Sequence, residues 1–207
     1  MAYRRLAIDP ATPQRVRGVI QSLENHYFSD VHCMLRLPAP RCRFTAGCNF
    51  AITQVLTAAI GGLSVTLYRH TGGIGQRFKG VLIDYYPWDV EPNNRVTPND
   101  GAEVLYSVIR NPLTHNLGLD LEKKAKTAQV KIKRLSTKQK TQGLPERSFQ
   151  GLERSDRRLD MSPTVTVRPD ATVVLVEALY WGVRVMVERL TRDRARMQAA
   201  EAFLAQI

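Results

Sequence analysis

The stretch YSVIRNPLTHNLG, residues 106–118, combines side chains that could bind phosphate and transfer protons. Arg110 carries a permanently charged, planar guanidinium that can hold two phosphate oxygens at once. His115 titrates near neutral pH, so its imidazole can both accept and return a proton. The alternative is that this stretch is only a helix end followed by a turn.

Pro112 lies between these two residues and bears on whether they can meet. Proline cannot donate a backbone hydrogen bond and clashes with the preceding turn, so a helix must kink, bulge or stop there. The residue before a proline, here Asn111, is also disfavoured in a helical conformation. On an undistorted helix, positions five apart diverge by about 140°. We therefore expect a break at Pro112 that lets Arg110 and His115 converge on one ligand.

A doubled set of these residues would suffice to cleave RNA without a metal ion. Attack by the 2′-hydroxyl needs a base on that hydroxyl, an acid on the leaving 5′-oxygen and positive charge around the phosphorane. A two-fold homodimer with the motif at its axis would supply two histidines and two arginines. The acidic residues that follow the motif, Asp120 and Glu122, form no cluster, so we expect neither a metal nor a cofactor. DNA, which lacks the 2′-hydroxyl, would be spared.

The six residues RNPLTH, from Arg110 to His115, resemble the RNxxxH signature of the HEPN superfamily. The wider text LYSVIRNPLTHNLGL is similar to the motif region of many prokaryotic HEPN proteins. The resemblance covers mainly residues 100–120. It implies an all-α bundle, a symmetric dimer and metal-independent ribonuclease activity, often within toxin–antitoxin, phage-defence or CRISPR-linked systems. It also implies that Arg110 and His115 are catalytic and that Asn111 orients the pair or contacts phosphate.

Two features depart from that family. HEPN toxins that are silenced by adenylylation carry a tyrosine two places after the histidine, where this chain has Leu117. A basic excursion after residue 122 is not part of the minimal bundle. The excursion could serve as an RNA-binding addition or as a dimerisation arm.

Hydrophobic spacing predicts the helices that position the motif. Residues 13–37 form an amphipathic helix, with Thr12 as its cap and Pro13 at its first position. Asp100 and Glu103 resemble a capping box that begins the helix leading into the motif. The buried face of the first helix is expected to contain Val16, Val19, Ile20, Leu23, Tyr27, Val31, Met34 and Leu35.

Two further helices and a pair of strands complete the prediction. Residues 44–68 carry no charge, and their large apolar side chains fall on one helical stripe. Asp170 is expected to cap a last long helix that continues, with a kink, to the C-terminus. Residues 128–135 and 164–168 alternate as short strands do. The predicted fold is a single, mainly α domain over 1–207, a HEPN-like bundle of up-and-down helices with a small two-stranded β insert in the excursion 122–168.

The net charge of +11 indicates an anionic partner, and the charge is concentrated. Residues 122–158 contain twelve Lys or Arg and four acidic residues, which favours RNA because every neutralised phosphate releases counterions. A solvated basic loop is the alternative. The residues expected to bind RNA are Lys123, Lys124, Lys126, Lys131, Lys133, Arg134, Lys138 and Lys140.

Composition also bears on the compartment and on metal sites. The beginning of the chain does not resemble a signal peptide, and three cysteines without a pairing pattern favour a reducing compartment, so we expect a cytoplasmic protein. The uncharged helix is long enough to suggest a membrane span, but its polar residues favour a buried helix. Zinc ligation lacks the paired spacing of structural sites. The residues considered for zinc are His26, His32, Cys33, Cys42 and Cys48.

These observations leave three functions open. The first is a cytoplasmic, homodimeric HEPN-type endoribonuclease, with an antitoxin or accessory defence protein as a further partner. The second is a catalytically silent helical module that binds RNA or protein. The third is a nucleotide-binding regulatory subunit of a larger defence system. The role of the aromatic residues Tyr85, Tyr86 and Trp88 is also open: they either stack on bases or cover the surface of the protein.

Overall fold

The computed structural model describes residues 3, 5–36, 48–69, 71–91, 96–115, 129–133, 163–168 and 171–207, and for Pro112, His115 and 129–133 the backbone alone. The helices are α1 (Gln14–Leu23), α2 (Ser29–Arg36), α3 (Asn49–Leu63), α4 (Ile74–Tyr85), α5 (Pro98–Glu103), α6 (Asn111–His115), α9 (Val176–Arg192) and α10 (Arg194–Leu204). Three π-helical turns, η1 (Glu24–Phe28), η2 (Ser64–Tyr68) and η4 (Val104–Arg110), and a 3₁₀ turn, η3 (Trp88–Val90), join them. The strands are β1 (Gln129–Lys133), β2 (Val165–Val167) and β3 (Ala171–Leu175).

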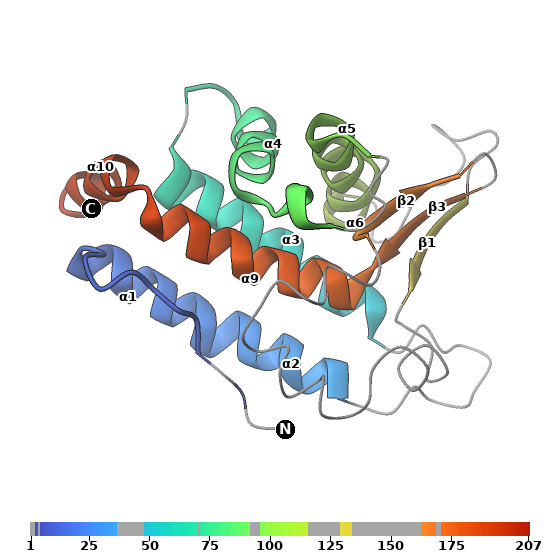
Figure 1. Ribbon diagram of the computed structural model, residues 1–207, viewed down its shortest axis with the longest axis horizontal. Helices are drawn as coiled ribbons and strands as arrows, with labels where there is room; N and C mark the ends of the chain where they lie inside the picture. The colour runs from blue at the N-terminus through green and yellow to red at the C-terminus, as the bar shows by residue number, and fades with distance from the viewer. Residues whose placement is uncertain are drawn as a thin grey trace.

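The helices pack around α9, which runs through the middle of the molecule (Figure 1). One side of α9 contacts α3 and α4, and α10 folds back against α1 and η2. Large side chains from nearly every helix meet in one hydrophobic cluster that includes Ile20, Leu56, Phe78, Leu105 and Leu179. The prediction of a mainly helical fold with a small β insert is confirmed.

The β insert lies at one end of α9 (Figure 1). Both segments that we predicted as strands are strands, and β3 lies between them in the order β1-β3-β2. β1 pairs with β3 in parallel, and β2 pairs with β3 antiparallel. The register sets Lys131 opposite Val173 and Lys133 opposite Leu175, which are the half-buried positions of β3.

The prediction of a helix over 171–175 is wrong, because these residues form β3. Their sequence, ATVVL, is β-branched at three of five positions and pairs with strands on both edges. The helix α9 begins at Val176, and Asp170, the predicted cap, lies outside the described residues. The predicted kink is a complete interruption at Asp193, whose carboxylate accepts a hydrogen bond from the Arg196 backbone N–H and so begins α10.

A π-helical turn changes which side chains of the first helix enter the core. The turn η1 adds one residue to a helical turn between α1 and α2. Phe28 is therefore fully buried, whereas Tyr27, which we predicted in the core, is 41% exposed. Val16, Ile20, Leu23 and Val31 are buried as predicted.

The N-terminus of α1 is capped by a carboxylate from α10. Gln14 is the first helical residue, and Thr12 makes no side-chain cap, contrary to the prediction. Instead, the Glu201 carboxylate on α10 accepts hydrogen bonds from the backbone N–H groups of Arg15 (3.0 Å) and Val16 (3.1 Å). These N–H groups have no acceptor within the helix, and the positive end of the helix dipole attracts the carboxylate.

The uncharged segment forms α3 and η2 and contributes one face to the core. Its stripe of Ile52, Leu56, Ile60, Leu63 and Leu67 is buried. The stretch Asn49–Tyr68 has 20 residues and is long and apolar enough to cross a membrane. An 18-residue window within it has a mean hydropathy of 1.7, and half of that window is buried in the protein. Core helices of soluble proteins meet the same criterion, so the stretch by itself is weak evidence for a membrane.

The aromatic residues at the end of α4 and directly after it pack against the rest of the protein. Tyr86 and Trp88 are buried, with ring centroids 4.3 Å apart. The Trp88 indole N–H donates to the Leu82 carbonyl at 2.8 Å. The Tyr85 hydroxyl donates to the Asp193 carboxylate at 2.5 Å, which joins the end of α4 to the start of α10.

Candidate functional site

The motif lies at the end of a helical segment that runs without interruption from Pro98 to His115 (Figure 1). The segment begins three residues before the capping box that we predicted. Thr97 is the cap: its hydroxyl oxygen accepts a hydrogen bond from the Asp100 N–H at 3.2 Å, and the Asp100 carboxylate accepts one from that hydroxyl at 2.7 Å. Pro98 at the first helical position suits such a start, because its missing N–H would have no partner there.

The helix does not stop at Pro112, so the break that we expected to bring Arg110 and His115 together is absent. Asn111 has helical angles, with φ −63° and ψ −50°, and α6 continues to His115. The distortion is instead taken up by the π-helical turn η4, in which the Asn111 N–H bonds to the Tyr106 carbonyl five residues back. A π turn is wider than an α turn, which gives the proline ring room where it would otherwise meet the carbonyl four residues before it. A bulge was one of the three outcomes expected at Pro112.

Arg110 is held by its own helix in a half-exposed position. Its Nη1 donates to the Oδ1 of Asn111 at 2.9 Å. Its guanidinium carbon lies 5.6 Å from the centroid of the Tyr106 ring, within the range of a cation–π contact. The Tyr106 ring packs in turn on Phe78, with centroids 5.4 Å apart. The guanidinium therefore has an orienting partner on each of two sides, and neither partner neutralises its charge.

A second cation reaches the same tyrosine from α4. The Lys79 ammonium lies 5.8 Å from the Tyr106 ring centroid and forms a 2.9 Å ion pair with Glu103. The Glu103 carboxylate also accepts a hydrogen bond from the Ser107 hydroxyl. We call the six residues Lys79, Glu103, Tyr106, Ser107, Arg110 and Asn111 the motif-side cluster.

The remaining predicted site residues are placed only in part. His115 is the last residue of α6, and its backbone is helical. Since residues 110–115 follow one continuous helix, no helix break brings Arg110 and His115 together. Lys131 and Lys133 belong to β1. The other predicted RNA-binding residues, Lys123, Lys124, Lys126, Arg134, Lys138 and Lys140, lie outside the described residues.

A buried arginine forms a separate polar cluster that the sequence did not suggest. Arg184 on α9 is 5% exposed and donates to the hydroxyls of Tyr3 (3.1 Å) and Tyr180 (3.3 Å). Its guanidinium also lies within 6 Å of the Phe28 and Trp181 rings. This cluster ties the N-terminal segment to the bundle, so we interpret it as structural.

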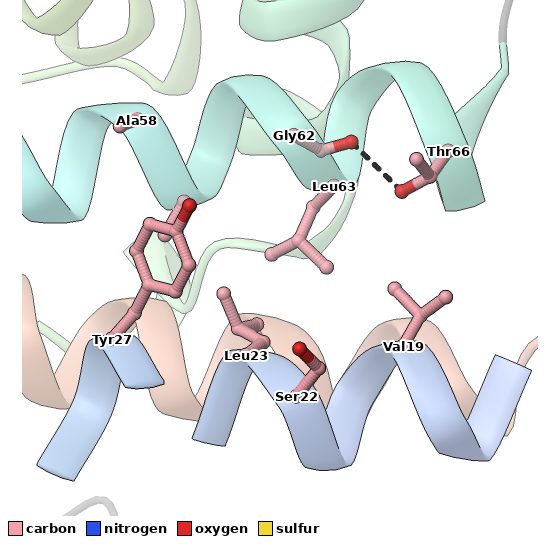
Figure 2. Close-up of a pocket in the computed structure, with 9 residues that line it drawn as sticks. Val19, Ser22, Leu23, Tyr27, Ala58, Gly62, Leu63 and Thr66 are labelled. Atoms are coloured by element: carbon pink, nitrogen blue, oxygen red, sulfur yellow. Dashed lines mark hydrogen bonds between the residues drawn. The ribbon is translucent and has the colours of Figure 1, made fainter. Parts of the chain in front are cut away.

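An apolar groove of about 230 Å³ lies between α1 and α3. Figure 2 shows Val19, Leu23 and Tyr27 on one side and Ala58, Gly62 and Leu63 on the other. The groove carries no charged lining residue, so it offers no cation for a phosphate. Among the described side chains, no group of three or more His, Cys, Asp or Glu is placed to hold a metal ion.

Comparison of the chain with protein-family models, with curated proteins and with solved structures finds no match.

Four members of the motif-side cluster were not predicted as site residues from the sequence: Lys79, Glu103, Tyr106 and Ser107. Tyr106 and Arg110 are four residues apart, and this spacing puts side chains on the same helix face, so their contact could have been found. Lys79 is 31 positions from Arg110 in sequence and reaches the cluster only because α4 packs against α5 and η4. No local signal marks it.

Proposed function

We propose that the protein acts on RNA at the motif-side cluster, as a metal-independent endoribonuclease of HEPN type that works as a homodimer in the cytoplasm. The observation that carries this proposal is the setting of Arg110. A half-exposed guanidinium that is held by an amide and an aromatic ring is prepared to bind a phosphodiester with little loss of side-chain entropy. The concentration of positive charge in the chain supports the same partner.

In this proposal each residue of the motif has one task. Arg110 binds the scissile phosphate and stabilises the charge that develops on the phosphorane. Asn111 keeps the guanidinium in place through its hydrogen bond. His115 transfers a proton, as base for the 2′-hydroxyl or as acid for the leaving 5′-oxygen. The second histidine and the second arginine come from the partner copy, because one chain has a single motif.

Incubation of 5′-labelled RNA with the purified full chain in EDTA tests the proposal. We expect cutting that leaves 2′,3′-cyclic phosphate ends, no cutting of the matching DNA, and a mass of two chains by light scattering. His115→Ala should reduce the rate at least 100-fold, since a general acid or base contributes about that much or more, while the dimer persists. The control is His26→Ala, because His26 is exposed on η1. Equal rates for wild type and His115→Ala would refute the ribonuclease.

A second candidate, a module that binds RNA without cutting it, has one observation in its favour. The helix continues through Pro112, so the break that would have brought Arg110 and His115 together is missing. The same variants separate the two functions. If RNA is bound and never cut, and if Arg110→Ala weakens binding while Arg194→Ala on the exposed face of α10 does not, the binding module is correct.

A further inference from the structure

We infer that Glu103 occupies part of the RNA site in the free protein, where its carboxylate takes the place of an RNA phosphate on Lys79 and Ser107. The inference rests on the proposed function, in that RNA is the ligand, and it adds a regulated subsite to it. Lys79, which comes from α4, becomes a phosphate-binding residue. Glu103 becomes a resident competitor that the RNA backbone must displace.

The donors around Glu103 are those that a phosphate would use. One carboxylate oxygen accepts from the Lys79 ammonium at 2.9 Å, and the other accepts from the Ser107 hydroxyl. An ammonium and a hydroxyl also bind phosphate oxygens in proteins. A carboxylate held by both therefore resembles the ligand that we propose for these groups.

The cation that Glu103 neutralises belongs to the same site as Arg110. The Lys79 ammonium and the Arg110 guanidinium both lie within 6 Å of the Tyr106 ring centroid. The hydrogen-bond acceptor of Arg110 is a neutral amide, whereas that of Lys79 is a carboxylate. Among the described residues, Arg110 thus has no anionic partner in this cluster, whereas the Lys79 ammonium can contact an RNA phosphate only after Glu103 moves away.

The ion pair is accessible enough to be exchanged. The Lys79 side chain is 33% exposed and the Glu103 side chain 53% exposed. Exposed pairs of this kind are held weakly, so a polyanion with several contacts elsewhere can replace the carboxylate. Glu103 therefore favours the binding of polyanions over single phosphates. A ligand with one phosphate gains little affinity from Lys79, because Glu103 competes with it. An RNA chain that is already bound at Arg110 can displace Glu103 with a second phosphate.

The test measures the affinity of a fluorescent single-stranded RNA for the full chain, in EDTA and over a range of salt concentrations. All proteins carry His115→Ala, so that cutting does not affect the readout. Glu103→Gln should tighten binding by roughly two- to five-fold, the range expected from freeing an exposed ion pair. Lys79→Ala should weaken binding and lower the slope of log K against log salt by about one.

The double variant decides between a specific competitor and a general effect of charge. In the presence of Lys79→Ala, Glu103→Gln should no longer tighten binding, because the carboxylate then has no cation to release. The matched control is Asp30→Asn, which removes one exposed negative charge on α2. If Glu103→Gln tightens binding equally with and without Lys79, or no more than Asp30→Asn, the inference is wrong.

Failure of this inference is distinguishable from failure of the proposed function. In the first case RNA still binds and Arg110→Ala still weakens it, but the Lys79–Glu103 coupling is missing. In the second case no variant of the motif-side cluster changes RNA binding, which overturns both. Melting temperatures of all the variants within a few degrees of wild type show that the fold is intact.

Discussion

Arg110 illustrates how a helix can orient one of its own side chains. Its two partners, Tyr106 and Asn111, are supplied by the same helix at positions i−4 and i+1. Neither partner carries an opposite charge, so neither one neutralises the guanidinium. A lysine at this position would keep the charge but lose the planar fork that binds two oxygens.

At the same scale, Glu91 gives a prediction that concerns pH. Glu91 is buried and accepts hydrogen bonds from the Thr164 N–H at 3.1 Å and from the Thr164 hydroxyl, which also bonds to Tyr86. Burial raises the pKa of this carboxyl from 4.5 to about 7. The folded protein therefore keeps a proton that the unfolded chain releases, so Glu91 lowers the free energy of unfolding as pH rises from about 4.5 to about 7.

We expect Glu91→Gln to gain stability relative to wild type as the pH increases through this window. The amide accepts the same hydrogen bonds and does not ionise. Urea unfolding of both proteins at pH 5, 6, 7 and 8 measures the difference, and it should be most favourable to the variant at pH 8. Asp30→Asn is the control for an exposed carboxylate. A difference that is independent of pH would show that Glu91 does not titrate as described.

At the scale of elements, two glycines in helices have opposite reasons to be there. A Cβ added to Gly62 on α3 would meet nothing within 4 Å, because the residue lines the open groove of Figure 2. A Cβ added to Gly182 on α9 would overlap the Tyr86 ring and its hydroxyl. Gly182 is therefore required by the packing of α9 on the segment after α4, whereas the packing of the chain does not require Gly62.

We expect Gly62→Ala to raise the free energy of unfolding by about 0.5–1 kcal/mol, since alanine restricts the unfolded chain and favours the helix. Gly182→Ala should lower it by roughly 1–3 kcal/mol, because a buried aromatic ring has to move. Chemical denaturation of the two variants beside wild type provides the measurement. If both substitutions stabilise the protein, the close approach of Tyr86 to α9 is wrong.

At the scale of the whole molecule, α1 and α10 are joined by hydrogen bonds and an ion pair. Glu201 on the last helix accepts two backbone N–H groups at the start of the first helix. It also forms a 3.4 Å ion pair with the Arg15 side chain. Most of the helical bundle lies between these two elements in sequence. The contact therefore stabilises the tertiary structure and not only the start of α1.

Glu201→Ala should therefore lower the free energy of unfolding by about 1–2 kcal/mol, as the loss of a helix cap does. Arg15→Ala should cost less, because it removes only an exposed ion pair. Urea unfolding compares the two. An equal loss for both variants would mean that the side-chain ion pair, and not the capping of α1, holds the ends together.

The sequence by itself determined where most of the helices and two of the strands lie, and it identified the residues of the motif. The helical stripe of α3, the amphipathic start of α1 and the alternation in β1 and β2 depend on the period of apolar residues, which is local information. The prediction that Arg110 binds phosphate also comes from the chemistry of its guanidinium alone, and it stays a prediction. These predicted helices and strands are confirmed because each depends on residues within a few turns or strand positions of one another.

Only the tertiary structure decided the rest. The π-helical turns moved Phe28 into the core in place of Tyr27 and accommodated Pro112 without a break, because packing on neighbouring helices outweighs the local preference of a single residue. β-Pairing on both edges made a strand of 171–175. Lys79 lies in the same cluster as Arg110, and Glu201 caps α1. Both contacts connect residues too far apart in sequence for a periodic pattern to predict. Contacts between distant segments form only when the whole core is buried, so the sequence does not show them locally.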